Sequence, residues 1–444
     1  MSVLKTAREM LEEYPLCDRC LGRQFALLGY GVENDDRGKS IKTALVLEAQ
    51  ASSLTGHADG VKILKIIATN GFSEIARQVL RRMKKRVPTR DLPEVCFLCE
   101  DKFQVIDGLF EKSLGFLGEY DYNSFLVGVE LPVAAEERED ELKAKFGVSH
   151  GESMRNEFGR LLGKRIALAN GKEVDFKKPE VVVLVNPFAE TVRLQSNPLF
   201  VAGRYKKLVR DIPQSKWFCS SCRGKGCEKC NWTGKMYPES VEEIIGKPFL
   251  EVTGGTQTSF HASGREDIDA RMLGKGRPFV IEITKPRKRF VNLKEIVEAI
   301  NSQARGKVIV SNMRFADKAV VRRMKKGEAA QKEYRVTVEF EKRISSSDMR
   351  LLKERLTNAV VKQRTPIRVS HRRADLTREK YIYEVNVKKL APQKAEMKIR
   401  CQGGLYVKEL VTGDEGRTTP NVSDILKNPA KPSNLDVLNV MTKE

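Results

Sequence analysis

The chain has 444 residues, with 80 lysines or arginines against 59 aspartates or glutamates, for a formal net charge of +21. At roughly 150 residues per domain, this length accommodates about three domains. Hydrophobic residues make up 41% of the sequence, which excludes a disordered chain. So large a basic surplus is typical of proteins that bind nucleic acid, and less often of proteins that bind anionic membranes.

The N-terminal segment predicts a helix, because Leu4, Ala7 and Leu11 are apolar at helical spacing. It contains acidic residues and lacks the unbroken apolar core of a signal peptide. No apolar run elsewhere approaches the roughly 18 residues of a membrane span. We therefore expect a cytoplasmic protein with no membrane partner. Disulfides are rare in that compartment.

Short elements are predicted along the next 200 residues. Residues 61–69 (VKILKIIAT) predict a strand, and a helix is predicted to follow from Ser73. Beyond residue 110, the patterns predict strands and helices in the order β, α, α, β, β, which indicates a small mixed domain. The predicted ranges are Phe125–Leu131, Ala134–Phe146, Met154–Leu162, Glu180–Val185 and residues 192–194.

The C-terminal part, from residue 240, predicts a long α+β stretch without Rossmann spacing. Residues 292–295 resemble a capping box in front of a helix. Apolar residues alternate with polar ones over 334–340 and again over 381–387, the pattern of half-buried strands. Residues 345–347 are serines that can cap a further helix.

Eight of the nine cysteines fall in four Cys-x-x-Cys pairs. Two pairs lie close together in WFCSSCRGKGCEKCNWTG, where each closes a tight turn on one side of a metal. Two such turns make a tetrahedral four-thiolate zinc site. Its predicted ligands are Cys219, Cys222, Cys227 and Cys230.

The other two pairs, Cys17/Cys20 and Cys96/Cys99, are separated by 75 residues. We expect them to share a second zinc ion, an inference from pairing alone. The alternatives are a redox Cys-x-x-Cys pair or unligated buried thiols. Neither four-cysteine set leaves an open coordination position, so both zinc sites are expected to be structural. Cys401 remains as a buried thiol.

Residues 262–279 form the most unusual segment, with glycine bends, alternating charges and a following apolar strand. This pattern predicts a structured loop that delivers side chains to a cleft. The string Gly264-Arg265-Glu266-Asp267 is short, and a surface turn with an Arg–Asp pair would also explain it. Asp269 is the rival to Asp267 as a reactive carboxylate. The four histidines form no obvious catalytic set.

This segment is similar to the Gly-Arg-x-Asp motif of pseudouridine synthases, in which the aspartate is the nucleophile. In its extended form, GREDIDARMLGKGRPF, it resembles the archaeal and eukaryotic tRNA pseudouridine-54/55 synthase family. Other parts of the chain, including the cysteine pairs, resemble that family in the same order. These parts are residues 198–205, 212–217, 332–334, 363–373, 403–410 and 413–418.

The resemblance implies that the protein isomerises uridine to pseudouridine in the T-arm of tRNA, at positions 54 and/or 55. It implies that Asp267 is the nucleophile, attacking either the sugar or the base, and that no cofactor takes part in the chemistry. The implied substrate-binding residues are Arg265, Tyr334, Tyr406 and Lys408. We expect Lys408 to lie on the same strand face as Tyr406 and to pair with Asp267. Alternatively, Tyr334 and Tyr406 could be tyrosines of strands that pack in the protein core and do not contact substrate.

The expected organisation follows from the motifs and the resemblance together. Residues 1–210 form an N-terminal α/β accessory domain with the first zinc site and a THUMP-like RNA-binding part over about residues 60–205. Residues 211–240 form a zinc-binding linker. Residues 241–444 form the α+β, mixed-sheet pseudouridine synthase catalytic domain. We expect tRNA as the partner, no nucleotide cofactor and a monomer.

Two other classes of function fit some of these features. The first is another THUMP-containing tRNA-modifying enzyme, a methyltransferase or a thiolase. It would need a glycine-rich nucleotide loop or a pyrophosphate loop, and neither is found. The second is a non-catalytic, zinc-containing RNA-binding protein. Charge and cysteines fit that class equally well, and only residues 264–279 and 403–418 argue against it.

Overall fold

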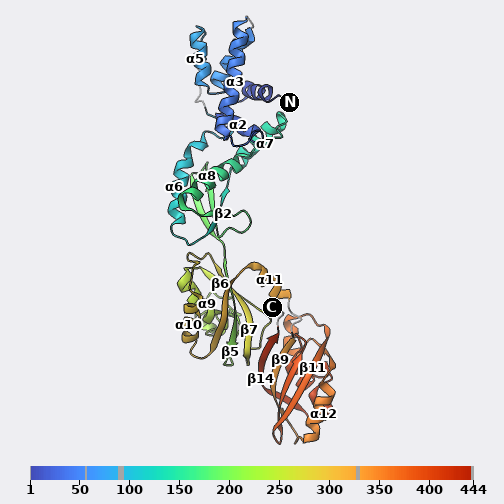
Figure 1. Ribbon diagram of the computed structural model, residues 1–444. Helices are drawn as coiled ribbons and strands as arrows, with labels where there is room; N and C mark the ends of the chain where they lie inside the picture. The colour runs from blue at the N-terminus through green and yellow to red at the C-terminus, as the bar shows by residue number, and fades with distance from the viewer. Residues whose placement is uncertain (1, 56–57, 89–94, 327–330, 442–444) are drawn as a thin grey trace. The chain divides into compact units, whose positions relative to one another are not determined.

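The computed structural model describes residues 2–55, 58–88, 95–326 and 331–441. The chain forms two compact units, Met1–Asn197 and Pro198–Glu444, each with its own core (Figure 1). Within the described ranges, no helix is both long enough and apolar enough to cross a membrane.

The first unit begins with a group of helices. They are α1 (Val3–Glu13), α2 (Asp18–Gly22), α3 (Asn34–Leu54), α4 (Ala58–Thr69) and α5 (Glu74–Arg82). The helices expected at the N-terminus and after Ser73 are confirmed, and the Ser73 hydroxyl accepts a hydrogen bond from the Ala76 amide as an N-cap.

The strand expected over residues 61–69 is wrong, because these residues form α4. Their β-branched composition favours a strand. However, Leu64, Ile67 and Ala68 are all buried, and their spacing of three and four residues puts them on one helical face. Packing against α3 and α5 therefore overrides the intrinsic preference of the segment.

A four-stranded sheet forms the rest of the first unit. Strand β1 (Ser124–Val129) is parallel to β2 (Glu173–Val174) and β3 (Val181–Asn186), and β3 is antiparallel to β4 (Thr191–Ser196). The sheet packs against α6 (Ile106–Leu117) and α8 (Met154–Asn170), and α7 (Val133–Lys145) lies between β1 and α8 in sequence. The predicted order β, α, α, β, β is confirmed, with the short β2 added.

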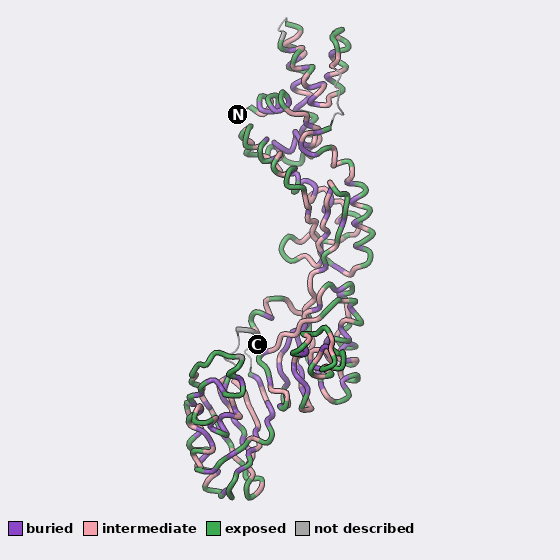
Figure 2. The backbone as a smooth tube through the Cα atoms, turned by 180° about the vertical axis from the view of Figure 1, so that it is seen from behind, coloured by how far each residue is buried: buried purple, intermediate pink, exposed green. Residues whose placement is uncertain are grey.

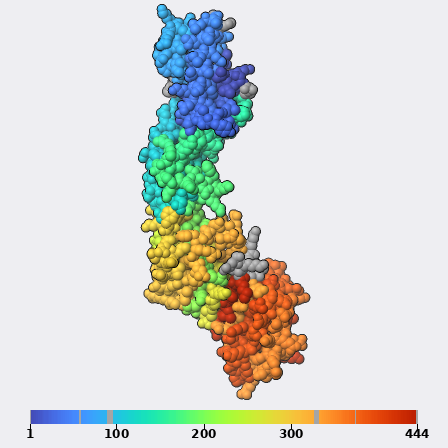
Figure 3. All heavy atoms as spheres, in the orientation of Figure 1, coloured from blue at the N-terminus to red at the C-terminus, as the bar shows by residue number. Residues whose placement is uncertain are grey.

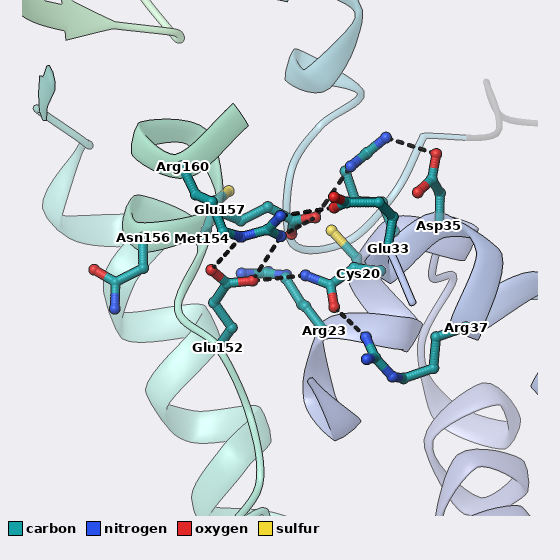
Figure 4. A network of polar contacts seen from close by, with 12 residues as sticks. Cys20, Arg23, Glu33, Asp35, Arg37, Glu152, Met154, Asn156, Glu157 and Arg160 are labelled. Carbon is teal, nitrogen blue, oxygen red and sulfur yellow. Dashed lines mark hydrogen bonds and ion pairs between the residues drawn. The ribbon is translucent and has the colours of Figure 1, made fainter. Parts of the chain in front are cut away.

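A network of ion pairs connects the helical group to the sheet-forming part of this unit (Figure 4). The Arg23 side chain is fully buried, and its NH1 donates to Glu139 Oε1 of α7 at 2.7 Å. Arg160 of α8 donates to Glu152 Oε1 at 3.0 Å and to Glu33 Oε2, next to α3, at 2.6 Å. Because both partners of the Arg23–Glu139 pair are buried, neither can exchange its partner for water.

The second unit is built on one ten-stranded sheet. Nine strands follow one another in the order β13-β10-β11-β12-β9-β14-β7-β5-β8, and β6 pairs with β7 beside this path. Their bounds are β5 Leu199–Lys207, β6 Gln257–Ala262, β7 Ala270–Thr284, β8 Val308–Ala316, β9 Gln331–Phe340, β10 Ala359–Arg364, β11 Thr377–Ala391, β12 Lys394–Cys401, β13 Thr418–Thr419 and β14 Ala430–Met441. The structure thus includes β5 in this unit, although it precedes the expected boundary at residue 210.

Helices cover the two halves of this sheet and create two cores. Helices α9 (Val241–Thr253) and α10 (Leu293–Gln303) pack on the half that contains β5 to β8. Helix α12 (Ser346–Leu356) packs on β11 in the other half (Figure 1). Buried residues run along the strands between them (Figure 2). The serine cap expected at 345–347 and the strands expected at 334–340 and 381–387 are confirmed. Asn292 is the N-cap of α10, but its side chain accepts from the Lys294 amide and donates to the Glu295 carboxylate, which differs from the expected capping box.

The C-terminal strand β14 joins the two halves of the sheet. It is antiparallel to β9 on one side and parallel to β7 on the other. The space-filling view shows its dark red atoms between the yellow-green and orange segments of the unit (Figure 3). Asp436 of β14 is buried and accepts hydrogen bonds from Arg271 of β7 at 2.8 and 2.9 Å, from Arg335 of β9 at 3.0 Å and from Arg210 at 2.8 Å. One carboxylate therefore ties both neighbouring strands to β14.

We predict that Asp436→Asn lowers the free energy of unfolding of the second unit by about 3–5 kcal/mol, because three arginines then lose their common buried anion. Denaturant unfolding followed by hydrogen exchange on β7 and β14 measures this loss. The matched control is Glu339→Gln on β9, whose ion pair with Lys394 is largely exposed; it should cost about 1 kcal/mol or less. Equal losses in the two variants would contradict the assignment.

We also predict that the contribution of the Asp436 carboxylate to folding stability depends on pH. Burial alone would raise the pKa of Asp436, but the hydrogen bonds from Arg271 and Arg335 hold the pKa below its ordinary value of 3.8. Because the pKa of Asp436 is lower in the folded state than in the unfolded state, its stabilisation is fully present above the unfolded-state pKa and is lost as the pH falls through the folded-state pKa. The stability difference between the protein and Asp436→Asn should therefore shrink in acid.

Candidate active site and metal centres

The Gly-Arg-x-Asp segment forms a loop between β6 and β7. Gly264 has a φ of +77°, and a Cβ there would lie 2.9 Å from Lys332 Nζ and 3.1 Å from an Arg277 nitrogen. Glycine suits this position for two reasons: it adopts a positive φ without strain, and it has no Cβ to clash with these side chains. Three residues later, the Asp267 side chain is 36% exposed, so it is open to a substrate.

Buried groups hold this loop from below. Glu266 is buried and accepts hydrogen bonds from Arg277 Nε at 2.8 Å and from the Tyr205 hydroxyl at 2.8 and 3.0 Å. Arg277 also donates to the Ser263 carbonyl at 2.7 Å, and Gln214 Nε2 donates to the Gly264 carbonyl at 3.1 Å. The residue between Arg265 and Asp267 in the motif thus points inwards and anchors the loop.

Lys207, at the end of β5, holds the backbone on the far side of Asp267. Its buried ammonium donates to the carbonyls of Ile212 at 2.8 Å, Asp267 at 3.2 Å and Ile268 at 2.9 Å. Burial lowers the pKa of Lys207 to about 8. Fixing the carbonyl of Asp267 limits where its carboxylate can lie, which is the kind of preorganisation that a reacting group needs.

Two cations from the other half of the sheet approach the carboxylates of the loop. Arg368 NH1 lies 3.1 Å from Asp267 Oδ2 and Lys408 Nζ lies 3.3 Å from the same atom. Lys408 is closer to Asp269, at 2.7 and 2.8 Å. Burial alone would raise the pKa of Asp269, but the Lys408 ammonium holds it below its usual range. The structure therefore surrounds both candidate carboxylates with positive charge.

The expected strand placement of Lys408 is wrong. Residues Val407–Thr412 form the short helix α13, and Tyr406 is its N-cap residue. Gln363 of β10 fixes this helix start, because its side chain accepts from the Tyr406 amide at 2.8 Å and donates to the Tyr406 carbonyl at 2.9 Å. Lys408 thus reaches the loop from a helix end and not from a strand face.

The predicted aromatic residues have different environments. Tyr334, on β9, packs against the cores of both halves of the sheet. Burial raises the pKa of its phenol, and the Asp267 carboxylate adds to the shift. The ring of Tyr406 lies 5.9 Å from the Arg368 guanidinium carbon, and its hydroxyl accepts from Arg373 at 3.1 Å. Arg368 therefore lies near both the Tyr406 ring and the Asp267 carboxylate.

Arg265 contacts an aromatic ring. Its guanidinium carbon is 5.0 Å from the centre of the Trp217 ring. Arg368 was not predicted as an individual site residue, although it lies within the basic segment 363–373. Glu266 was not predicted either, and its partners Arg277 and Tyr205 come from two different strands. No local pattern identifies a residue whose role depends on such distant partners.

The four-cysteine sets each form a compact cluster. In each set all four Sγ atoms lie within 4.8 Å of one another. Measured separations include 3.8 Å for Cys17–Cys99, 3.9 Å for Cys219–Cys227 and 3.7 Å for Cys227–Cys230. A tetrahedral zinc with Zn–S bonds of about 2.3 Å requires S–S separations of about 3.8 Å. The donor type and the spacing therefore fit a metal ion, and the two distant pairs do meet.

Backbone amides support the second cluster. The amides of Gly226, Cys227 and Gly234 donate to cysteine sulfurs at 3.2 to 3.3 Å. Such N–H···S bonds stabilise negative charge on sulfur, the form that binds metal. With four protein ligands available, neither cluster needs water as a ligand, as is typical of structural sites.

Comparison with known proteins gives matches over almost the whole chain. The family model "Pus10, C-terminal" matches residues 200–441, and "Pus10 THUMP domain, archaeal" matches residues 110–186. A tRNA pseudouridine synthase Pus10 from Methanocaldococcus jannaschii is 43% identical, covering 97% of this chain and 93% of that protein. The one from Methanothrix thermoacetophila is 39% identical, covering 99% of this chain and 94% of that protein.

Among solved structures, a Cbf5-Nop10-Gar1 complex matches 55% of this chain and 50% of that chain, with a TM-score of 0.30 and 12% identity. The expected fold class, an α+β protein with a mixed-sheet catalytic part and a THUMP domain, agrees with the observed architecture and the family models. On the full-length sequence matches, the chain is an isomerase that belongs to the Pus10 family of tRNA pseudouridine synthases.

Proposed function

We propose that this enzyme converts uridine to pseudouridine in the T-arm of tRNA, at position 54, position 55 or both, with Asp267 as the nucleophile. The observation that carries the proposal is the placement of Asp267. Its carboxylate is partly exposed, its backbone is anchored by buried groups, and two cations from the opposite half of the sheet lie within 3.3 Å. Two cations in contact with one carboxylate oxygen can hold that carboxylate in position for attack.

The reaction breaks the N1–C1′ bond of the nucleoside, turns the base, and joins C5 to C1′. The C5 proton is lost and N1 gains a proton, so the product is an isomer and no redox cofactor is required. Asp267 can hold the fragment covalently between the two bond changes, by attack on the sugar or on the base. We assign Tyr334 and Tyr406 to the walls of the uracil pocket and Arg265 to substrate binding.

Lys408 and Arg368 would position the Asp267 carboxylate. Arg368 is itself held by Glu409, whose Oε1 accepts from Arg368 Nε at 2.6 Å. A target base inside folded RNA must be turned out of its stack before it can reach Asp267. The +21 net charge fits an enzyme in which favourable contacts to RNA phosphates offset the free-energy cost of turning the base out.

We also propose that both cysteine clusters hold structural zinc, and that the enzyme acts in the cytoplasm as a monomer. Thiolates must stay reduced to bind metal, and the cytoplasm keeps them so. The metal would contribute stability and not chemistry, since each cluster supplies all four ligands.

We predict that Asp267→Asn abolishes pseudouridine formation and leaves tRNA affinity within a few-fold of the unaltered enzyme. The amide keeps the size of the side chain but removes the nucleophilic charge. Mapping of pseudouridine in a tRNA transcript measures the product, and a filter-binding titration measures affinity. The matched control is Asp269→Asn, two residues away, which should retain much more activity. Full activity of Asp267→Asn would refute the mechanism.

We predict that Lys408→Met lowers the single-turnover rate by about 10- to 100-fold, because the Asp267 and Asp269 carboxylates lose the ammonium between them. Affinity for tRNA should change little. The matched control is Lys427→Met, a lysine of the same sheet half outside the site. A similar rate for both variants would show that Lys408 does not position the nucleophile.

For the metal, we predict two zinc ions per purified chain, measured by elemental analysis without added metal. Cys222→Ser should reduce this to one and lower thermal stability more than the rate of the remaining folded enzyme, because the site is closed. Cys401→Ser, which alters the one cysteine outside both clusters, should keep two. Less than one zinc per chain in the unaltered protein would contradict both assignments.

A further inference from the structure

The segment from Lys216 to Met236, called here the knuckle, surrounds the second cysteine cluster. Within the second unit it lies beside the Gly-Arg-x-Asp loop, which follows it in the chain after α9 and β6. Gln214, just before it, donates to the Gly264 carbonyl, and Trp217 lies under the Arg265 guanidinium. Trp217 therefore connects the knuckle to the Gly-Arg-x-Asp loop at Arg265, and the preceding Gln214 holds the same loop at Gly264.

The knuckle surface is positively charged. It carries five basic residues and a single acid, Glu228; the basic residues are Lys216, Arg223, Lys225, Lys229 and Lys235. Even with a divalent metal on four thiolates, which together carry two negative charges, the segment stays positive. In the part of the chain that the structure describes, no ion pair joins Arg223, Lys225 or Lys229 to a carboxylate, and all three are exposed.

Trp232 is the residue that the fold explains least. Its side chain is 72% exposed, so it contributes little to a core. Its φ is +61°, in the left-handed region that a bulky side chain disfavours. The turn is required, because the Trp232 amide donates to the Cys227 carbonyl at 2.9 Å and the Trp232 carbonyl packs on Gly226. Glycine would make this turn without strain, so the indole serves something other than the fold.

A second aromatic ring is exposed beside a cation. Phe218 is 56% exposed, and the Lys216 ammonium lies 5.0 Å from the centre of its ring. Its ring packs on the backbone of Gly224, where an added Cβ would come within 2.7 Å. The backbone thus supports one face of the ring, as in a preformed stacking platform.

We propose that the knuckle binds the substrate RNA, with an unpaired base stacked on Trp232. Phe218 offers a second platform, and Arg223, Lys225 and Lys229 bind the adjoining phosphates. Exposed rings among unpaired cations are the combination that recognises single-stranded nucleotides. A site next to the Gly-Arg-x-Asp loop meets the RNA where the extruded target leaves its neighbours unstacked. This inference rests on the proposed function, because it takes the bound RNA to be the substrate.

The test uses the full chain and a tRNA transcript, with Trp232→Gly and Trp232→Phe as variants. Trp232→Gly should weaken RNA binding about 5- to 100-fold, the effect of losing one stacked base, while Trp232→Phe should restore most of the affinity. Two zinc ions should remain bound, and the Tm of Trp232→Gly should equal or exceed that of the unaltered protein, because glycine relieves the strain. The matched control, Phe315→Ala, removes another exposed ring of the same unit and should bind normally.

The outcomes separate this inference from the proposed function. If the unaltered protein forms pseudouridine and Trp232→Gly binds RNA equally well, the knuckle inference is wrong and the enzyme assignment stands. If Trp232→Gly loses zinc or has a lower Tm, Trp232 has a structural role and the inference is also wrong. If the unaltered protein forms no pseudouridine but Trp232→Gly loses affinity, the proposed reaction fails and the RNA-binding knuckle stands.

Discussion

The second unit depends on the hydrogen bonds that the buried carboxylate of Asp436 accepts from three arginines. This carboxylate accepts hydrogen bonds from Arg271 on β7 and Arg335 on β9, and so joins the two halves of the sheet through β14. Its third partner, Arg210, also donates to the Asp269 carbonyl at 2.6 Å. Arg210 therefore connects the contact that joins the two halves of the sheet to the end of the Gly-Arg-x-Asp loop. A change at Asp436 would reach Asp269, two residues from Asp267, through this shared arginine.

The site itself is divided between the halves that Asp436 joins. One half provides the loop with Asp267, held by Glu266 and Lys207 beneath it. The other half provides Arg368 and Lys408, which face the loop. Negative and positive charges thus come from separate cores, and neither core alone makes the pair. The arrangement of Asp267, Arg368 and Lys408 therefore depends on both halves of the ten-stranded sheet.

The parts of the structure that the sequence could predict have local signals. Cysteine spacing identified the ligands of the second cluster, and apolar alternation identified β9 and β11. Local patterns failed where packing decided the outcome. Residues 61–69 have strand-like composition but form α4, because a buried helical face and a buried strand use similar residues.

Lys408 illustrates the other kind of failure. Its proximity to Asp267 was expected from the family resemblance. Its place on a helix end, however, depends on Gln363, which bonds to the N-cap residue Tyr406, 43 residues away in the chain. Glu266 likewise owes its role to Arg277 and Tyr205. Contacts between residues so far apart in the chain produce no local pattern from which they could be predicted.

The position of β14 in the chain, after both of the strands that it joins, has a consequence for synthesis. Strands β7 and β9 can be bridged only after residues 430–441 have been made and have left the ribosome. Until then, each half-sheet has an open edge of unpaired amides and carbonyls, the kind of edge that pairs with other chains. Both cysteine clusters lie in residues made before β14, so their cysteines can come together while the two half-sheets are still separate. The Asp267 loop and its partners Arg368 and Lys408 belong to different half-sheets, and pairing of β14 with β7 and β9 joins these halves.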